Sequence, residues 1–432
     1  MPEQTHANPA NAPIAVIGAG IIGACVAACL QRDGHAVMLV DPDEPGAGAS
    51  SGNAGMLSTS SIIPVGMPGI ARKVPGWLLD PHGPLTLRWR YLPAIAPWLL
   101  RLLRSATPDK VELQARALRS LLQSSLENYR PLVADAGAGH LVHQRGTLYL
   151  YASEQSWRAD ALNTAIRRRN GIRIDDVVGA DLRALEPDLA PAFTHARLVR
   201  ANGHVSHPRA LVQALVAHAA SGGARVLREC VRGFEHNGAQ VTAVLTGEAR
   251  HAVRGVVLSC GAWSRTLATE LGDRVPLDTE RGYHITIANP EKGPRTPTLY
   301  VDGNVGVTPM DMGLRFTGTV ELAGLQAPPD WRRADGLLDK ARALYPGLVP
   351  ASATTVADAS GRVTRWMGFR PSMPDSLPVI GPSSRFGNAW YAFGHGHSGM
   401  CAASTTGRLI ADLVAGRAPC IPSAPFSAQR FY

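Results

Sequence analysis

The sequence has 432 residues, of which 45% are hydrophobic and 18% are charged. This length fits two or three domains, or one large domain interrupted by another, and the apolar content excludes a disordered chain. The formal net charge is +9, yet only four of the 43 basic residues are Lys, and no basic run carries interleaved aromatic residues. The composition therefore argues against nucleic-acid binding and leaves acidic ligands or an anionic membrane surface as partners.

The N-terminal part predicts a strand, a Gly-rich turn, a helix and a second strand. Residues 14–17 form a short apolar run, the G-x-G-x-x-G pattern follows at 18–23, and a second apolar run over 36–40 ends in an acidic residue. Glycines in this context let a backbone approach a pyrophosphate at a helix N-terminus, and the acid accepts hydrogen bonds from a ribose. We therefore expect a dinucleotide, FAD or NAD, to contact Gly18, Ala19, Gly20, Ile22, Gly23 and Asp41.

The 17 uncharged residues from Ile14 to Leu30 also resemble a signal peptide or a short membrane span. The preceding residues contain Glu3 and no Lys or Arg, so a buried strand and helix is the better interpretation.

The six cysteines form no C-x-x-C pair, and the histidine pairs 204/207 and 395/397 lack further ligands at metal spacing. We expect a reduced, cytoplasmic protein with no metal site.

The remaining chain mixes helical and strand patterns. Apolar spacing predicts helices within 76–130 and over 156–170, 208–221 and 406–415, and strands over 146–151, 226–234, 241–245 and 255–259. Residues 281–321 alternate in the manner of an antiparallel sheet.

Five dispersed segments resemble one known family. They are Gly48–Met56, Val257–Ser264, Arg281–His284, Trp366–Gly381 and Ala392–Met400. In this order they resemble the FAD-dependent amino-acid oxidoreductases, which include D-amino-acid oxidase, glycine oxidase, sarcosine oxidase and the bacterial D-amino-acid dehydrogenases. The last two segments look closest to the dehydrogenase branch.

The resemblance implies an α/β (α+β) two-domain fold with a discontinuous Rossmann-type FAD domain over 1–80, 196–282 and 362–432. A substrate domain with a mixed or antiparallel sheet would cover 81–195 and 283–361. The resemblance adds these FAD contacts: Ser50, Ser51, Asn53, Ala54, Gly55, Met56, Val231, Gly261, Trp263, Gly394, His395, Gly396, Gly399 and Met400. Some relatives attach FAD through a Cys near the closing motif, but 370–381 contains none, so non-covalent FAD is expected.

Three residues are predicted to act on the substrate. In the family the arginine of the G-x-R-P motif, here Arg370, binds the substrate carboxylate, because a guanidinium offers two parallel charge-assisted hydrogen bonds. The alternative is a structural Arg370 paired with a carboxylate such as Asp375. Tyr283 could donate to the same substrate carboxylate or be a packed strand tyrosine, and His397 could point into the active site.

The implied reaction is hydride transfer from Cα of a D-amino acid to flavin N5, with D-proline or hydroxy-D-proline as possible substrates. Electrons would pass to a quinone-type acceptor. The alternatives are a glycine- or sarcosine-type amine oxidase that uses oxygen, and a non-catalytic FAD-containing or membrane-docking protein. An NAD-dependent dehydrogenase would leave the later motifs unexplained.

The segment 85–104 combines Trp, Tyr and Leu with Arg88, Arg90, Arg101 and Arg104. This composition suits either an interfacial membrane helix, on the inner face of the cytoplasmic membrane, or an ordinary amphipathic core helix. Pro93 and Pro97 are expected to break it.

Overall fold

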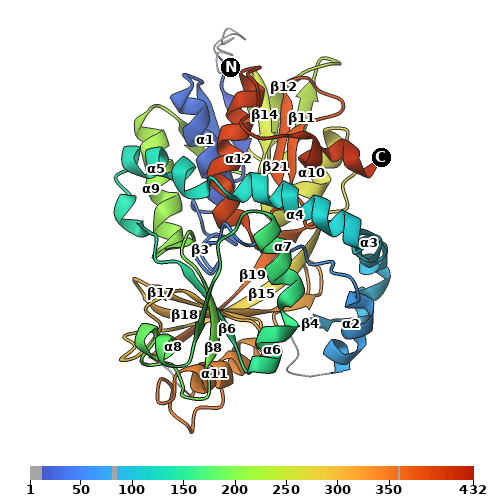
Figure 1. The fold of residues 1–432 in the computed structure, drawn as a ribbon. Coiled ribbons are helices and arrows are strands. Elements are labelled where there is room, and N and C mark those ends of the chain that lie inside the picture. Colours follow the sequence, from blue (N-terminus) through green and yellow to red (C-terminus); the bar gives the residue numbers. More distant parts are fainter. Residues whose placement is uncertain (1–11, 80–84, 359–360) are drawn as a thin grey trace.

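A computed structural model describes residues 12–79, 85–358 and 361–432, and shows two large sheets that lie one above the other (Figure 1). The upper one is six-stranded, and all its strands run parallel except the last. In spatial order the strands are β10 (Arg225–Leu227), β2 (Val37–Val40), β1 (Ile14–Ile17), β14 (Gly255–Leu258), β21 (Ala389–Phe393) and β20 (Val379–Pro382). The residues of β1, β2 and β14 are buried throughout, as expected for a parallel sheet covered on both faces.

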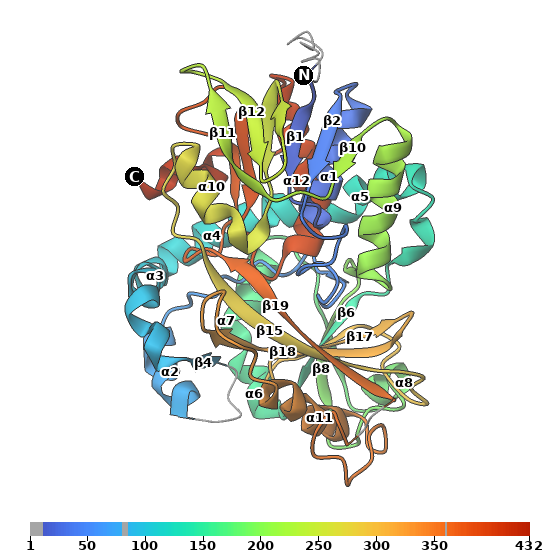
Figure 2. The ribbon, with the colours of Figure 1, turned by 180° about the vertical axis from the view of Figure 1, so that it is seen from behind.

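Helices cover one face of this sheet and a small antiparallel sheet covers the other (Figure 2). The helical layer contains α1 (Ile21–Arg32), α4 (Pro108–Leu122), α5 (Ser125–Asp135), α9 (Pro208–Ser221) and α12 (Gly399–Val414), which contribute to one hydrophobic core. Gly407 lets α1 and α12 approach closely, because a Cβ atom there would lie 2.7 Å from the Cys25 carbonyl oxygen. The opposite layer consists of β11 (Val231–His236), β12 (Val241–Thr246), β13 (Arg250–Ala252) and α10 (Ser264–Glu270).

The lower sheet has nine strands and is mixed. In spatial order it contains β19 (Val363–Ser372), β15 (Asp278–Ile287), β18 (Gly313–Leu322), β17 (Val305–Met310), β16 (Thr298–Tyr300), β6 (Thr147–Tyr151), β8 (His195–Val199) and β7 (Asp175–Val178), with β4 (Leu85–Leu87) beside β18. Helix α11 (Arg332–Leu344) packs on the face turned away from the parallel sheet. The other face is turned toward the parallel sheet (Figure 2).

Short elements complete the molecule. A three-stranded sheet joins β3 (Met56–Leu57), β9 (Gly203–Val205) and β5 (Val142–His143). The remaining helices are α2 (Ile70–Leu79), α3 (Leu92–Ser105), α6 (Glu154–Ala159), α7 (Ala161–Arg169) and α8 (Ala180–Leu185).

Three local predictions are wrong. The strand expected over 226–234 is two strands in different sheets, β10 and β11. The helix expected over 156–170 is interrupted at Asp160, whose carboxylate accepts a hydrogen bond from Tyr151. Helix α3 contains Pro93 and Pro97 without breaking, since Pro93 occupies its first turn and Pro97 follows one turn later. The domain boundaries stay a prediction.

Candidate active site

The Gly-rich turn follows β1 and opens α1. Gly18 has φ +106°, and a Cβ atom there would lie 2.5 Å from the Ser259 carbonyl oxygen at the end of β14. A Cβ on Gly23 would lie 1.8 Å from the Gly18 oxygen. At Gly20, by contrast, the nearest atom is the Ser50 hydroxyl at 3.2 Å. Two of the glycines thus permit close packing, while the third leaves the backbone accessible beside the helix N-terminus.

Asp41 lies at the end of β2, beside this turn. Its Oδ2 accepts a hydrogen bond from the Ala19 N–H at 2.7 Å, and its Oδ1 accepts one from the Asp43 N–H at 2.9 Å. Burial raises the pKa of the Asp41 carboxyl, and the two backbone donors oppose this shift. No acidic side chain lies in the first turn of α1. An anion such as a pyrophosphate is therefore compatible with this helix terminus.

The segment 48–56 is held from both sheets. The Ser50 hydroxyl accepts from the Ile21 N–H at 2.9 Å, and the Asn53 side chain bonds both the Ser50 oxygen and the Gly55 N–H. Arg315 on β18 donates to the backbone oxygens of Ser51 and Asn53, both at 2.9 Å. Because the Arg315 side chain is buried, its pKa is lowered to about 10. Arg315 was missed in the sequence, since only the fold brings it to this segment.

A pair of stacked aromatic side chains on β15 and β19 also contacts the segment 48–56. The rings of His284 and Trp366 stack with centroids 5.1 Å apart, and the His284 Nδ1 lies 2.8 Å from the Gly52 oxygen. A Cβ on Gly52 would lie 2.2 Å from the Trp366 ring. The segment that resembles a flavin-binding loop is thus packed directly on β15 and β19. Ala54 and Met56 continue it toward Gly306 on β17.

The closing Gly-rich turn leads from β21 into α12. Gly394 and Gly396 have φ of +83° and +54°, and the Gly396 N–H donates to the Pro371 oxygen at 2.8 Å. His395 is buried and its Nε2 contacts the Thr406 hydroxyl at 3.0 Å. Burial lowers the pKa of His395 to about 3, so the ring is neutral. Gly399 and Met400 begin α12, whose N-terminus faces the pocket described next.

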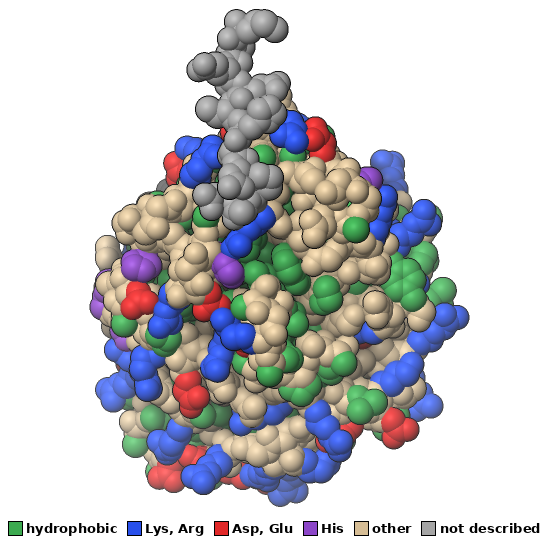
Figure 3. Space-filling model, turned by 90° about the horizontal axis from the view of Figure 1, so that it is seen from above, with side chains coloured by type: hydrophobic (Ala, Val, Ile, Leu, Met, Phe, Trp, Pro, Cys, Tyr) green, Lys and Arg blue, Asp and Glu red, His purple; other side chains and the backbone are tan. Residues whose placement is uncertain are grey.

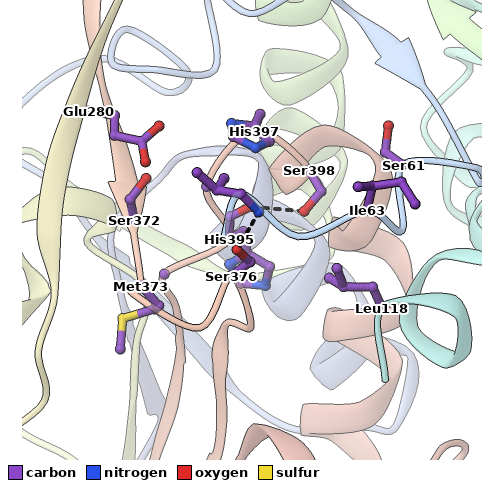
Figure 4. Close-up of a pocket in the computed structure, with 13 residues that line it drawn as sticks. Ser61, Ile63, Leu118, Glu280, Ser372, Met373, Ser376, His395, His397 and Ser398 are labelled. Atoms are coloured by element: carbon purple, nitrogen blue, oxygen red, sulfur yellow. Dashed lines mark hydrogen bonds between the residues drawn. The ribbon is translucent and has the colours of Figure 1, made fainter. Parts of the chain in front are cut away.

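A pocket lies between this turn and the lower sheet (Figure 4). Its polar lining includes Glu280 on β15, Ser372 at the end of β19, and His397 and Ser398 before α12. The Glu280 carboxylate and the His397 ring point toward each other across it (Figure 4). The surrounding protein lowers the pKa of His397, Glu280 opposes this shift and Arg370 adds to it. Glu280 was missed because only the pairing of β15 with β19 places it here.

Arg370 lies on the same face of the sheet as Glu280, its partner in the β15–β19 ladder. Its Nη1 donates to the Thr319 oxygen at 3.0 Å. Within the described residues no carboxylate oxygen lies within 4.0 Å of its guanidinium. Asp375, the alternative partner, instead pairs with Arg430 at 2.8 Å. Burial lowers the pKa of Arg370, and Glu280 partly restores it.

Tyr283 lies apart from Glu280, His397 and Arg370. It pairs with Met367, three residues from Arg370, so its side chain lies on the opposite face of the sheet. Its hydroxyl donates to Glu321 Oε2 at 2.5 Å and accepts from the Asp330 N–H at 2.9 Å. The expectation that Tyr283 contacts the substrate carboxylate is therefore wrong, and the packed-tyrosine alternative holds.

The other predicted cofactor residues lie around the upper sheet. Gly261 has φ +54° and follows β14, and the Trp263 ring is 52% exposed and meets Phe369 edge-on. Val231 begins β11 and is partly buried against the core on that face. Contacts of these residues with a cofactor stay predictions. Among the described residues no group of three or more His, Cys, Asp or Glu could hold a metal ion.

A parallel sheet ending in a Gly-rich turn, with a second sheet over the same space, is the architecture of a two-domain dinucleotide-dependent oxidoreductase. The chain belongs to the family DAO, FAD dependent oxidoreductase, which it matches over residues 13–413. The predicted family, fold class, enzyme class and FAD cofactor are thereby confirmed.

Individual relatives cover 97–100% of the chain. A "D-amino-acid oxidase" of Bradyrhizobium diazoefficiens is 42% identical over 437 residues, covering 100% of both proteins. A "D-amino acid dehydrogenase" of Cereibacter sphaeroides is 30% identical over 97% of this chain and 95% of its own. The crystal structure of glycine oxidase from Geobacillus kaustophilus has a TM-score of 0.70 at 23% identity and covers 97% of this chain and 98% of its own. At 23% identity, the similarity to this glycine oxidase concerns the fold alone.

Within the described ranges, no helix is both long and apolar enough to cross a membrane. On the face shown in Figure 3, Lys and Arg side chains are scattered among acidic and apolar ones, without a single basic patch.

Proposed function

We propose that this enzyme oxidises the α-amine of a D-amino acid to an imino acid, which water then hydrolyses to a 2-oxo acid. The observation that carries the proposal is the Arg370 guanidinium, held beside a pocket without a carboxylate partner in the described structure. A partly buried guanidinium in this state is suited to an anionic ligand, and the planar carboxylate of an amino acid matches its parallel N–H donors. The D configuration is supported by the two relatives, a D-amino-acid oxidase and a D-amino acid dehydrogenase.

The chain contributes binding and orientation. Arg370 fixes the substrate carboxylate and thereby the direction of the Cα–H bond. The positive end of α12 and the backbone N–H groups before it stabilise negative charge at the edge of the pocket. The chemistry that bound FAD supplies is acceptance of the hydride from Cα. FAD is expected to be held non-covalently, because Cys401 is buried within α12 and burial raises the pKa of its thiol to about 12.

Anaerobic spectroscopy of the FAD-loaded protein tests the reaction. D-amino acids, including D-proline, are expected to bleach the flavin absorbance, and their L-enantiomers are not. Bleaching by glycine or sarcosine alone would favour the amine-oxidase alternative. No bleaching by any panel member would favour a non-catalytic FAD protein.

Arg370→Lys tests the site. Because Lys cannot offer two parallel hydrogen bonds, we expect KM to rise roughly a hundredfold while FAD remains bound. Arg365→Lys is the matched control, since Arg365 lies on the same strand but on its other face, over Trp331. Equal kinetics in both variants would contradict the role of Arg370.

For the electron acceptor we propose a membrane quinone. The support is the surface of the segment 89–104, where Trp89, Leu100 and Leu103 are 67%, 54% and 43% exposed and Arg90, Arg101 and Arg104 are exposed as well. Apolar side chains beside arginines suit an anionic lipid surface such as the inner face of the cytoplasmic membrane. Arg88 is not part of this surface, because it pairs with the buried Glu321 at 2.6 Å. The core-helix alternative also has support, since Ile95 and Trp98 are buried.

Sedimentation with phosphatidylglycerol vesicles tests this surface. We expect binding to these vesicles and not to phosphatidylcholine, and Leu100→Gln with Leu103→Gln should reduce it at least tenfold. Leu162→Gln, on α7, is the control, because Leu162 is 53% exposed outside this surface. Oxygen is the second candidate acceptor, favoured by the oxidase name of the 42% identical relative. Adding air or a soluble quinone to the reduced enzyme separates the two by the rate of reoxidation.

A further inference from the structure

We infer that Glu280 selects the charge of the substrate side chain: it favours a cationic D-amino acid, such as D-lysine or D-arginine, and rejects an anionic one. This inference rests on the proposed function and assigns the pocket beside Arg370 to the substrate side chain.

The first support is the state of the Glu280 carboxylate. The residue is 4% exposed and lines the pocket. Its carboxylate forms no hydrogen bond or ion pair among the described residues. A buried carboxylate without a partner is costly, and a cationic ligand removes much of that cost. Glu280 therefore differs from Glu321, which lies on the other face of the sheet and is bonded by Arg88 and Tyr283.

The second support is the position of Arg370. Glu280 and Arg370 are direct neighbours across β15 and β19, yet their charged groups lie more than 4.0 Å apart. Glu280 lines the pocket and Arg370 lies beside it, so two opposite charges are close together without neutralising each other by contact. If Arg370 takes the α-carboxylate, a second carboxylate on the same substrate meets Glu280 in a site of low dielectric constant. An ammonium or guanidinium on the side chain is attracted by the same charge.

The remaining polar groups do not cancel this preference. His397 faces Glu280, and its pKa is lowered by desolvation and by Arg370, while Glu280 opposes this shift. Ser372 and Ser398 are uncharged. A carboxylate close to the α-amine would hold that amine protonated, which opposes loss of hydride from Cα. The charge is consequently assigned to the side-chain end of the substrate.

Charge-matched substrate pairs test the inference in the FAD-loaded wild-type enzyme. We expect kcat/KM for D-lysine to exceed that for its neutral analogue D-norleucine, and kcat/KM for D-glutamate to be below that for D-glutamine, each by roughly tenfold. The reverse order in either pair would overturn the inference. Absence of turnover with all four would overturn the inference if other D-amino acids bleach the flavin, and would overturn the proposed function if no D-amino acid does.

Glu280→Gln then isolates the residue, because it removes the charge and retains the size. The ratio of kcat/KM for D-lysine to that for D-glutamate should fall at least tenfold, while D-norleucine is still oxidised. Asp278→Asn is the matched control: Asp278 lies on the same strand and face, but its carboxylate is bonded by Tyr91 and is not part of the pocket lining. A ratio that changes less than twofold in Glu280→Gln, or equally in the control, would overturn the role of Glu280.

Discussion

The guanidinium of Arg370 lies directly over the backbone of Gly282. A Cβ atom built on this glycine would be 2.2 Å from Nη2 of Arg370, which is too close for any side chain. The missing side chain on β15 is therefore what allows Arg370 to extend from β19 across β15 to the Thr319 oxygen on β18. The Thr319 oxygen, which accepts from Nη1, fixes the other side of the guanidinium. Thr319 has φ +59°, an uncommon conformation for a β-branched residue, beside a register shift in the β15–β18 ladder.

Gly282→Ala is expected to displace Arg370 and raise KM for the substrate by roughly tenfold or more, with FAD retained. Steady-state kinetics and the flavin-to-protein ratio measure both effects. Gly387→Ala is the control, because no atom lies within 4 Å of a Cβ at that position. An unchanged KM in Gly282→Ala would show that the position of Arg370 does not limit substrate binding.

Asp41→Ala is expected to weaken FAD binding. The substitution removes the acceptor for the Ala19 N–H in the Gly-rich turn as well as the group predicted to bind the ribose. Loss of a charged hydrogen-bond partner corresponds to roughly a tenfold or larger increase in the FAD dissociation constant. Reconstitution of deflavinated protein, followed by flavin fluorescence, measures this constant. Asp43→Ala, which leaves the Asp41 carboxylate in place, should bind FAD normally.

Tyr283→Phe separates a structural role from a catalytic one. The hydroxyl group bonds Glu321 and the Asp330 N–H on the face away from Arg370. We expect KM to stay within twofold of the wild-type value, and the free energy of unfolding to fall by about 1–2 kcal/mol. Denaturant unfolding beside substrate kinetics provides the measurement. A large rise in KM with unchanged stability would restore the original assignment of Tyr283.

The nucleotide half of the site could be predicted from the sequence because its signals are local. The turn, the helix and Asp41 follow one another within about 30 residues. The role of each in binding a dinucleotide can be inferred from this one segment of the sequence. The same holds for the final helix and Gly416, whose φ of +65° suits a helix C-terminus.

The substrate half could be predicted only in part, because it depends on strand pairing. Side chains alternate between the two faces along each strand, but the sequence does not show which residues of β15 share a face with Arg370 on β19. Only the pairing of the two strands places Tyr283 and Arg370 on opposite faces. Glu280 and Arg315 come from strands far apart in sequence from the residues they face, and neither belongs to a motif. The strand pattern over 226–234 likewise contains no signal that β10 and β11 join different sheets.

The pH dependence of stability gives a prediction for His284. Burial lowers its pKa from 6.5 to about 3, and Arg315 contributes to the shift. Between these two values the unfolded chain binds a proton that the folded protein does not bind, so stability falls as the pH decreases from 6.5 toward 3. One such histidine removes about 1.4 kcal/mol per pH unit.

His284→Gln should therefore reduce the slope of the free energy of unfolding against pH by about 1.4 kcal/mol per unit between pH 6 and 5. Denaturant unfolding at a series of pH values measures the slope, whatever the stability of the variant at pH 7. The exposed His140 provides the control for loss of a histidine as His140→Gln. If His284→Gln has the wild-type slope, the ring is not held neutral by its surroundings. The stacking on Trp366 and the bond to Gly52 would then have to accommodate a charged imidazole.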